Sequence, residues 1–218
     1  WHPQNADRQY RGSVSLRTAL TLSINTVAVQ VADKVGTDNI ISNARKMGIT
    51  TLENGDSNLA MALGGLTHGV TPLEIAGAYG TFANKGVFIK PTGIVKILAR
   101  NGNVIEDNSL ESERTKTQVL TEKEAYMMTD MLSDVMTSGT GTTAAIGRPA
   151  AGKTGTTDDN KDAWFVGYTP NIVTAVWIGD DTGSETLGEV YGGTIPAQIW
   201  HDYMSAAVAD ESVKDFDV

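Results

Sequence analysis

The spacing of apolar residues predicts several helices along the first two thirds of the chain and a last third that is rich in strands. Residues 1–14 are polar and predict a loop. Helices are expected over 16–35, ended by Gly36; over 37–47, capped by Thr37 and ended by Gly48; over 72–84; from 122 through Val135; and from 194 through Met204. Two of these helices begin with capping boxes, at 71–74 and 121–124, in which a threonine and a glutamate each bond a free N–H group.

Two regions carry strand signals instead. Residues 94–98 and 104–105 flank Arg100-Asn101-Gly102-Asn103, and this pattern predicts a β-hairpin with a primed turn. The apolar runs 163–168 and 172–178 are separated by a short turn sequence that contains Pro170. Helices in the middle followed by consecutive strands favour an α+β fold with an antiparallel sheet.

Composition narrows the function classes. The chain has 218 residues, 40% of them hydrophobic, which suits one domain with a real core. Its formal net charge of -9 argues against a nucleic-acid partner, because phosphate binding needs clustered Lys and Arg. Cysteine is absent, and the three histidines are scattered without metal-ligand spacing, so we expect no metal and no cofactor. No apolar run approaches the roughly 20 residues that span a bilayer.

The segment around Lys153 fits two different motifs. From Gly147 to Thr154 it matches the phosphate-binding loop pattern, which would make the chain a P-loop NTPase. That site needs a helix starting at the Lys-Thr pair, yet the residues that follow are Gly, Thr, Asp and Asn, which are poor helix formers. The apolar run 173–180 ends in an aspartate that could bind magnesium, so the NTPase remains an alternative hypothesis.

Read forwards, Lys153-Thr154-Gly155-Thr156 matches the third motif of serine acyl-transfer enzymes that react with penicillin. On a strand beside a cleft, Gly155 would let a substrate backbone approach closely, and the hydroxyls of Thr154 and Thr156 would bond a carboxylate. Lys153 would add positive charge that favours an anionic substrate and assists proton transfer. If the Lys-Thr-Gly triplet is considered alone, a plain surface turn with a solvated lysine is the simpler explanation.

A second short motif is Ser23-Ile24-Asn25. On a regular helix, residues two apart point roughly 200° away from each other, so both side chains face one cleft only if the backbone breaks there. Alone, Ser23 is equally well explained as a hydroxyl on a helix surface.

A cluster of acidic residues keeps a carboxylate-pair hydrolase as an alternative function, although solvated loop carboxylates are the commoner explanation. Its members are Asp158, Asp159, Asp162, Asp180 and Asp181.

Several longer segments resemble the transpeptidase domain of class A (bifunctional) penicillin-binding proteins. They occur in the family's order at 10–17, 23–28, 70–84, 139–141, 151–157 and 162–170. The resemblance covers roughly Tyr10 to Met204 and implies a serine β-lactamase/transpeptidase-like α+β fold. In that fold an antiparallel sheet flanked by helices would carry Lys153 to Thr156, and a helical lobe would carry Ser23 and Asn25, with the cleft between them.

The resemblance also implies an activity and its residues. Such enzymes cross-link peptidoglycan: a serine attacks the bond between two D-alanines of a stem peptide, and β-lactams trap that serine. By motif, Ser23 would relay a proton to the leaving nitrogen, Asn25 would orient the substrate, and Lys153 would support the relay. Thr154 and Thr156 would hold the donor carboxylate beside Gly155, and the N–H of Thr156 would form part of the oxyanion hole.

The family's first motif, Ser-x-x-Lys, is missing, because no serine of the chain has a lysine three residues on. We therefore expect residues 1–208 to be the C-terminal portion of a transpeptidase domain, with 209–218 as an acidic tail or linker. The nucleophile would lie on a missing or companion segment, and the enzyme would be anchored by other segments at the outer face of a bacterial membrane. A wall-peptide-binding module without a nucleophile is the alternative.

Overall fold

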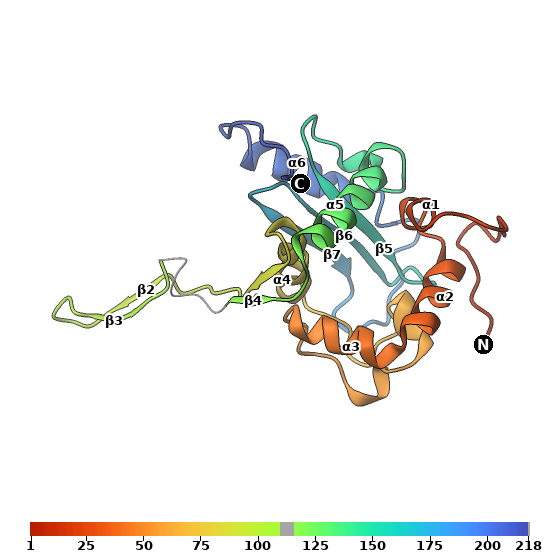
Figure 1. Ribbon diagram of the computed structural model, residues 1–218, viewed down its shortest axis with the longest axis horizontal. Helices are drawn as coiled ribbons and strands as arrows, with labels where there is room; N and C mark the ends of the chain where they lie inside the picture. Colours follow the sequence, from red (N-terminus) through yellow and green to blue (C-terminus); the bar gives the residue numbers. More distant parts are fainter. Residues whose placement is uncertain (110–115, 218) are drawn as a thin grey trace.

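The computed structural model describes residues 1–109 and 116–217, which form a body around a central sheet with one projecting arm (Figure 1). The sheet is antiparallel, in the order β5 (Ala151–Thr156), β6 (Asp162–Tyr168) and β7 (Val173–Gly179). The α+β architecture expected from the sequence is confirmed. Strand β5 lies at the edge of the sheet, so one side of its backbone faces the site described below.

In the described part of the chain, α-helices surround the sheet and form the adjoining lobe. They are α1 (Leu16–Thr21), α2 (Asn25–Val35), α3 (Thr37–Lys46), α4 (Pro72–Ala83), α5 (Glu122–Thr137) and α6 (Ile195–Ala207). Short 3-10 helices cover Asn54–Asp56, Leu59–Leu63 and Thr142–Ala144. Small antiparallel pairs also occur among the described residues: β1 (Val87–Ile89) pairs with β4 (Lys116–Gln118), and β2 (Lys96–Leu98) pairs with β3 (Val104–Asp107).

Both faces of the sheet are covered by helices. This explains why the sequence of β6 is an almost continuous run of apolar residues. On one face α6 places Trp200 against Phe165, with ring centroids 5.3 Å apart, and the Trp200 Nε1 donates to carbonyls of β6 and β7. On the other face Leu132 and Val135 of α5 pack with Tyr168. The Tyr168 hydroxyl is 2.8 Å from the Thr129 hydroxyl, so this buried polar group is satisfied.

A helical lobe lies beside the sheet, as expected. Its own apolar cluster is built from Ile41, Ile49, Leu52 and Ala78. Glu74, the glutamate of the first capping box, also accepts a hydrogen bond from the Thr50 N–H at 2.7 Å and thereby ties α4 to the loop that follows α3. Both predicted capping boxes are confirmed, whereas the predicted cap Thr37 is the first helical residue and Gly36 precedes it.

The β2–β3 pair is an arm that extends away from the body (Figure 1). The predicted hairpin is confirmed, but its primed turn is wrong. Gly102 has a φ of +86° while Asn101 does not reach positive φ, and the Gly102 N–H donates to the Ala99 carbonyl at 2.9 Å. Primed turns of type I′ require positive φ at both central residues, so the loop is wider than two residues.

The C-terminal segment lies against the body. Phe216 packs edge-on against Tyr168, with centroids 5.6 Å apart, and Lys85 pairs with Asp217 at 3.1 Å. Of the segment expected as a tail or linker, Val218 lies outside the described residues. Among the helices of the described chain, none has the length and apolar character needed to cross a bilayer.

Candidate active site

The predicted helix 16–35 is interrupted at Ser23. Helix α1 ends at Thr21, α2 begins at Asn25, and Ser23 between them has a φ of 53°. Left-handed backbone is rare for a residue with a Cβ and persists where the surroundings hold it. Here the neighbouring Ile24 is buried and its N–H donates to the Ala19 carbonyl at 2.8 Å. The break turns the Ser23 side chain toward β5.

One hydrogen bond of the site joins residues that are 130 positions apart in the sequence. Lys153 Nζ donates to Ser23 Oγ at 2.7 Å and to the Thr154 carbonyl at 3.0 Å. Burial lowers the pKa of Lys153 from 10.5 to about 8, because desolvation disfavours the charged ammonium. At neutral pH the Lys153 amine is still mainly protonated. The hydrogen bond that Ser23 Oγ accepts therefore comes from a charged ammonium group and is charge-assisted.

The two threonines of the Lys153 motif lie next to each other along the edge strand. Thr156 Oγ1 accepts a hydrogen bond from the Gly192 N–H at 3.0 Å, so its own hydroxyl hydrogen remains available for another acceptor. Thr154 Oγ1 lies 2.7 Å from Thr140 Oγ1. Between the threonines, Gly155 leaves the edge of β5 without a side chain, and together these groups form a short row of donors at an open strand edge.

Asn25 occupies a different position from the other candidates. It is the first residue of α2, and its Nδ2 donates to the Gln4 carbonyl at 2.9 Å. This hydrogen bond directs the Asn25 amide toward the N-terminal segment. The structure therefore brings together Ser23, Lys153 and the threonines, while Asn25 borders the group from the α2 side.

Asn5 is not among the residues predicted from the sequence, because it lies in a segment expected only as a loop. Asn5 is 5% exposed, and its Oδ1 accepts from the Thr26 N–H at 3.0 Å and faces the Thr26 hydroxyl at 3.2 Å. The N-cap residue of α2 is Ile24, which has no side-chain oxygen. Asn5 thus supplies, from 21 residues away, the cap that the helix lacks and holds the break that carries Ser23.

Replacing Asn5 with alanine is expected to lower the free energy of unfolding by about 1–2 kcal/mol, because a helix cap is lost and the partly buried Thr26 N–H is left without this acceptor. Urea denaturation would measure the change. Gln4→Ala is the matched control, since Gln4 contributes only its backbone carbonyl to Asn25. Equal stability of the two variants would contradict the capping role of Asn5.

The structure contradicts the P-loop hypothesis for Gly147 to Thr154. Lys153 lies in the middle of strand β5, whereas a phosphate-binding lysine stands at the start of a helix. Two residues of the acidic cluster have structural partners. Asp162, the first residue of β6, accepts from the Trp177 indole of β7 at 2.9 Å, and Asp180 accepts from the Ser184 N–H in the turn after β7 at 3.0 Å. These two carboxylates stabilise the sheet edge and a turn, and the Lys153 site remains the candidate for chemistry.

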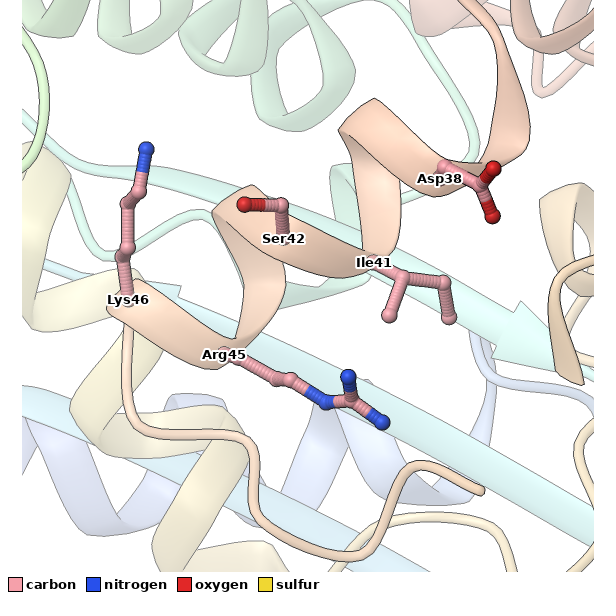
Figure 2. A pocket seen from close by; sticks show the side chains of 5 residues that line it. All are labelled: Asp38, Ile41, Ser42, Arg45 and Lys46. Carbon is pink, nitrogen blue, oxygen red and sulfur yellow. The ribbon is translucent and has the colours of Figure 1, made fainter. Parts of the chain in front are cut away.

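A shallow depression on α3 offers no comparable arrangement. Figure 2 shows its lining side chains diverging from one helix, with Lys46 and Ser42 on one side and Arg45 on the other. Arg45 donates to the Leu52 carbonyl at 3.0 Å, which anchors the loop after α3. These groups do not converge on a common point, so the depression lacks the geometry of a catalytic site.

Comparison with known proteins gives concordant matches. The family model described as the penicillin binding protein transpeptidase domain matches residues 1–205. The chain is 42% identical to penicillin-binding protein 1A of Aquifex aeolicus, with 100% of the chain and 29% of that protein covered. It is 41% identical to penicillin-binding protein 1A of Neisseria meningitidis, with 98% of the chain and 27% of that protein covered. The chain thus spans less than a third of these curated relatives.

Solved structures agree with these matches. Penicillin-binding protein 1A from Haemophilus influenzae superposes with a TM-score of 0.85 at 27% identity, covering 100% of this chain and 38% of that one. The PonA1 protein from Mycobacterium tuberculosis, solved in complex with penicillin V, gives 0.85 at 29% identity over 98% of this chain and 61% of that one. The fold is therefore shared along almost the whole chain.

Proposed function

The chain belongs to the penicillin-binding protein transpeptidase family, and we propose that it supplies the proton-relay and carboxylate-binding part of a peptidoglycan D,D-transpeptidase site. The observation that carries this proposal is the 2.7 Å hydrogen bond from Lys153 Nζ to Ser23 Oγ. Lysine and serine side chains linked in this way, partly buried at the edge of a sheet, suit the transfer of a proton beside an anionic substrate.

The proposed substrates are stem peptides ending in two D-alanines, and β-lactams that mimic them. A serine oxygen forms a bond to the carbonyl carbon of the penultimate D-alanine, and the C–N bond to the last one breaks. Ser23 passes the serine proton to the leaving nitrogen while Lys153 stabilises the charge on the relay. Thr154 and Thr156 donate to the terminal carboxylate, and the Thr156 N–H contributes to the oxyanion hole. An amine of a second stem then attacks the acyl-enzyme.

The nucleophile in this proposal comes from a segment outside the 218 residues. Support comes from the sequence, in which no serine precedes a lysine by three positions. The same segment, or its neighbours, would anchor the enzyme at the outer face of a bacterial membrane. The same sequence feature favours a second candidate, a module that binds wall peptides without acylation.

Labelling with a fluorescent penicillin tests the proposal. The full-length product of the gene is incubated with the label, digested, and its modified peptide is identified by mass spectrometry. We expect one labelled serine outside the sequence shown here, in a Ser-x-x-Lys context. Labelling of a serine within the 218 residues would overturn the assignment of the nucleophile. Binding of stem peptide without any labelling would replace the enzyme with the binding module.

The depressed pKa of Lys153 predicts an alkaline limit to acylation. Because the group loses its proton near pH 8, the rate constant for acylation by benzylpenicillin should fall as the pH rises through about 8. The folded state binds this proton less tightly than the unfolded chain, so the cost of burying Lys153 is full below pH 8 and is relieved between about 8 and 10.5. A rate that stays flat to pH 9.5 would contradict the role of the charged lysine.

A further inference from the structure

The loop that follows α5 joins the two halves of the site. Gly139, Thr140 and Gly141 lie between the end of α1 and strand β5, and the Thr140 N–H donates to the Thr21 carbonyl at 3.3 Å. A Cβ at Gly139 would stand 2.8 Å from the Val135 Cα and would collide with the Thr21 carbonyl oxygen. Only a glycine at position 139 allows the loop to come this close to Thr21, which is two residues before Ser23 in the sequence.

The same loop also contacts the segment that precedes α6. A Cβ at Gly193 would collide with the Thr140 carbonyl oxygen and lie 3.8 Å from the Thr154 methyl carbon. Thr140 is therefore fixed by its backbone on two sides, while its side chain is exposed. Its hydroxyl is directed along the edge of β5 toward Thr154, at 2.7 Å.

The hydrogen count of the threonine pair has a chemical consequence. Two hydroxyls 2.7 Å apart share one hydrogen between their oxygens, which leaves the second hydrogen free to donate elsewhere. Thr156 is in a comparable state, because the Gly192 N–H occupies an acceptor position of its oxygen. Each of the two motif threonines thus has a partner that orients it, and the Thr140–Thr154 pair as a whole and Thr156 each keep one donor hydrogen for a ligand.

We propose that Thr140 is a further specificity-determining residue, which orients the Thr154 hydroxyl so that the pair donates to the carboxylate of the donor substrate. This inference rests on the proposed function of the Lys153 site and adds a residue outside the Lys-Thr-Gly-Thr motif. A preoriented donor hydrogen is effective toward an anion because little reorganisation is needed when the ligand arrives. Exposure of the Thr140 side chain fits this role, since a hydroxyl that serves only packing is normally covered.

The test compares a ligand that has the carboxylate with one that lacks it. Acylation of the full-length protein is measured with benzylpenicillin and with its neutral methyl ester, for the wild type and Thr140→Val. Losing one hydrogen bond to a charged group should slow the benzylpenicillin reaction by about tenfold or more. The ester reaction should change less than about twofold, because it has no carboxylate for the pair to bind.

Two further variants separate the hydroxyl from the shape of the loop. Thr140→Ser keeps the oxygen and should restore most of the discrimination between the two ligands. Thr143→Val changes an exposed threonine in the adjoining 3-10 helix and should leave both rates as in the wild type. Equal losses on both ligands for Thr140→Val, or no loss on either, would overturn the proposal. A wild-type protein that neither ligand acylates would instead overturn the proposed function.

Discussion

Replacing Lys153 with methionine is expected to slow acylation of the full-length protein by benzylpenicillin about 100- to 1000-fold. Methionine keeps much of the side-chain volume but removes the ammonium that bonds Ser23 Oγ at 2.7 Å and the Thr154 carbonyl at 3.0 Å. Without that charge, the relay loses its stabilising partner, and the Thr154 carbonyl loses a donor. The second-order rate constant, measured by stopped-flow with a fluorescent penicillin, gives the effect.

A double-variant experiment makes this expectation specific. If Lys153 acts through Ser23, then Ser23→Ala combined with Lys153→Met should be little slower than the worse single variant, because each removes the same hydrogen bond. Lys123→Met, at an exposed position in the first turn of α5, controls for the loss of one positive charge. Additive losses from Ser23 and Lys153 would argue that the two side chains act separately.

The parts of the fold that sequence predicted best are those whose bonds are local. In the capping boxes, Thr71 with Glu74 and Thr121 with Glu124 make reciprocal hydrogen bonds within four residues, so the pattern contains the whole interaction. The strands 163–168 and 172–178 were equally evident, because burial of both sheet faces demands continuous apolar runs.

Features that depend on residues far apart in the sequence could not be predicted from the local pattern in the same way. Helical spacing continues across Ser23, and only the condition that Ser23 and Asn25 face one cleft pointed to a break. The break is held by Asn5, which caps α2 through the Thr26 N–H, 21 residues after Asn5. The turn of the arm shows the same limit on a smaller scale. Asn101-Gly102 is the usual signal for a primed turn, yet the strand register shifts between Ile97 and Leu98, and the loop widens to match it.

The candidate site combines both cases. The motifs at Ser23 and Lys153 were identified because the chain resembles a family, since each triplet alone has a simpler explanation. The distance of 2.7 Å between Lys153 Nζ and Ser23 Oγ follows from how α1, the loop after α5 and β5 pack together. The same packing produces the hydrogen bond between Thr140 and Thr154. Spacing along the sequence carries no information about contacts over 130 residues, so these distances required the folded chain.

Gly192→Ala is expected to lower the free energy of unfolding by about 2–3 kcal/mol, toward the upper end of the cost of overpacking. A Cβ there would lie 2.5 Å from the Gly155 carbonyl oxygen and 2.8 Å from the Gly155 nitrogen, and would collide with the Trp164 carbonyl. All three are backbone atoms of the paired strands β5 and β6, which cannot move aside as a flexible side chain can. Urea denaturation would measure the loss.

The same substitution should also disturb the site, because the loop can relieve the clash only by moving away from β5. That movement would break the hydrogen bond from the Gly192 N–H to Thr156 Oγ1 and leave the Thr156 hydroxyl free to rotate. Gly93→Ala is the matched control, since a Cβ at Gly93 meets no atom within 4 Å. If Gly192→Ala were as stable as Gly93→Ala and equally reactive with penicillin, the loop would not be held against β5 as described. A stable but slowly acylated Gly192→Ala variant would show instead that the loop moves at little energetic cost and that its contact with Thr156 serves the site alone.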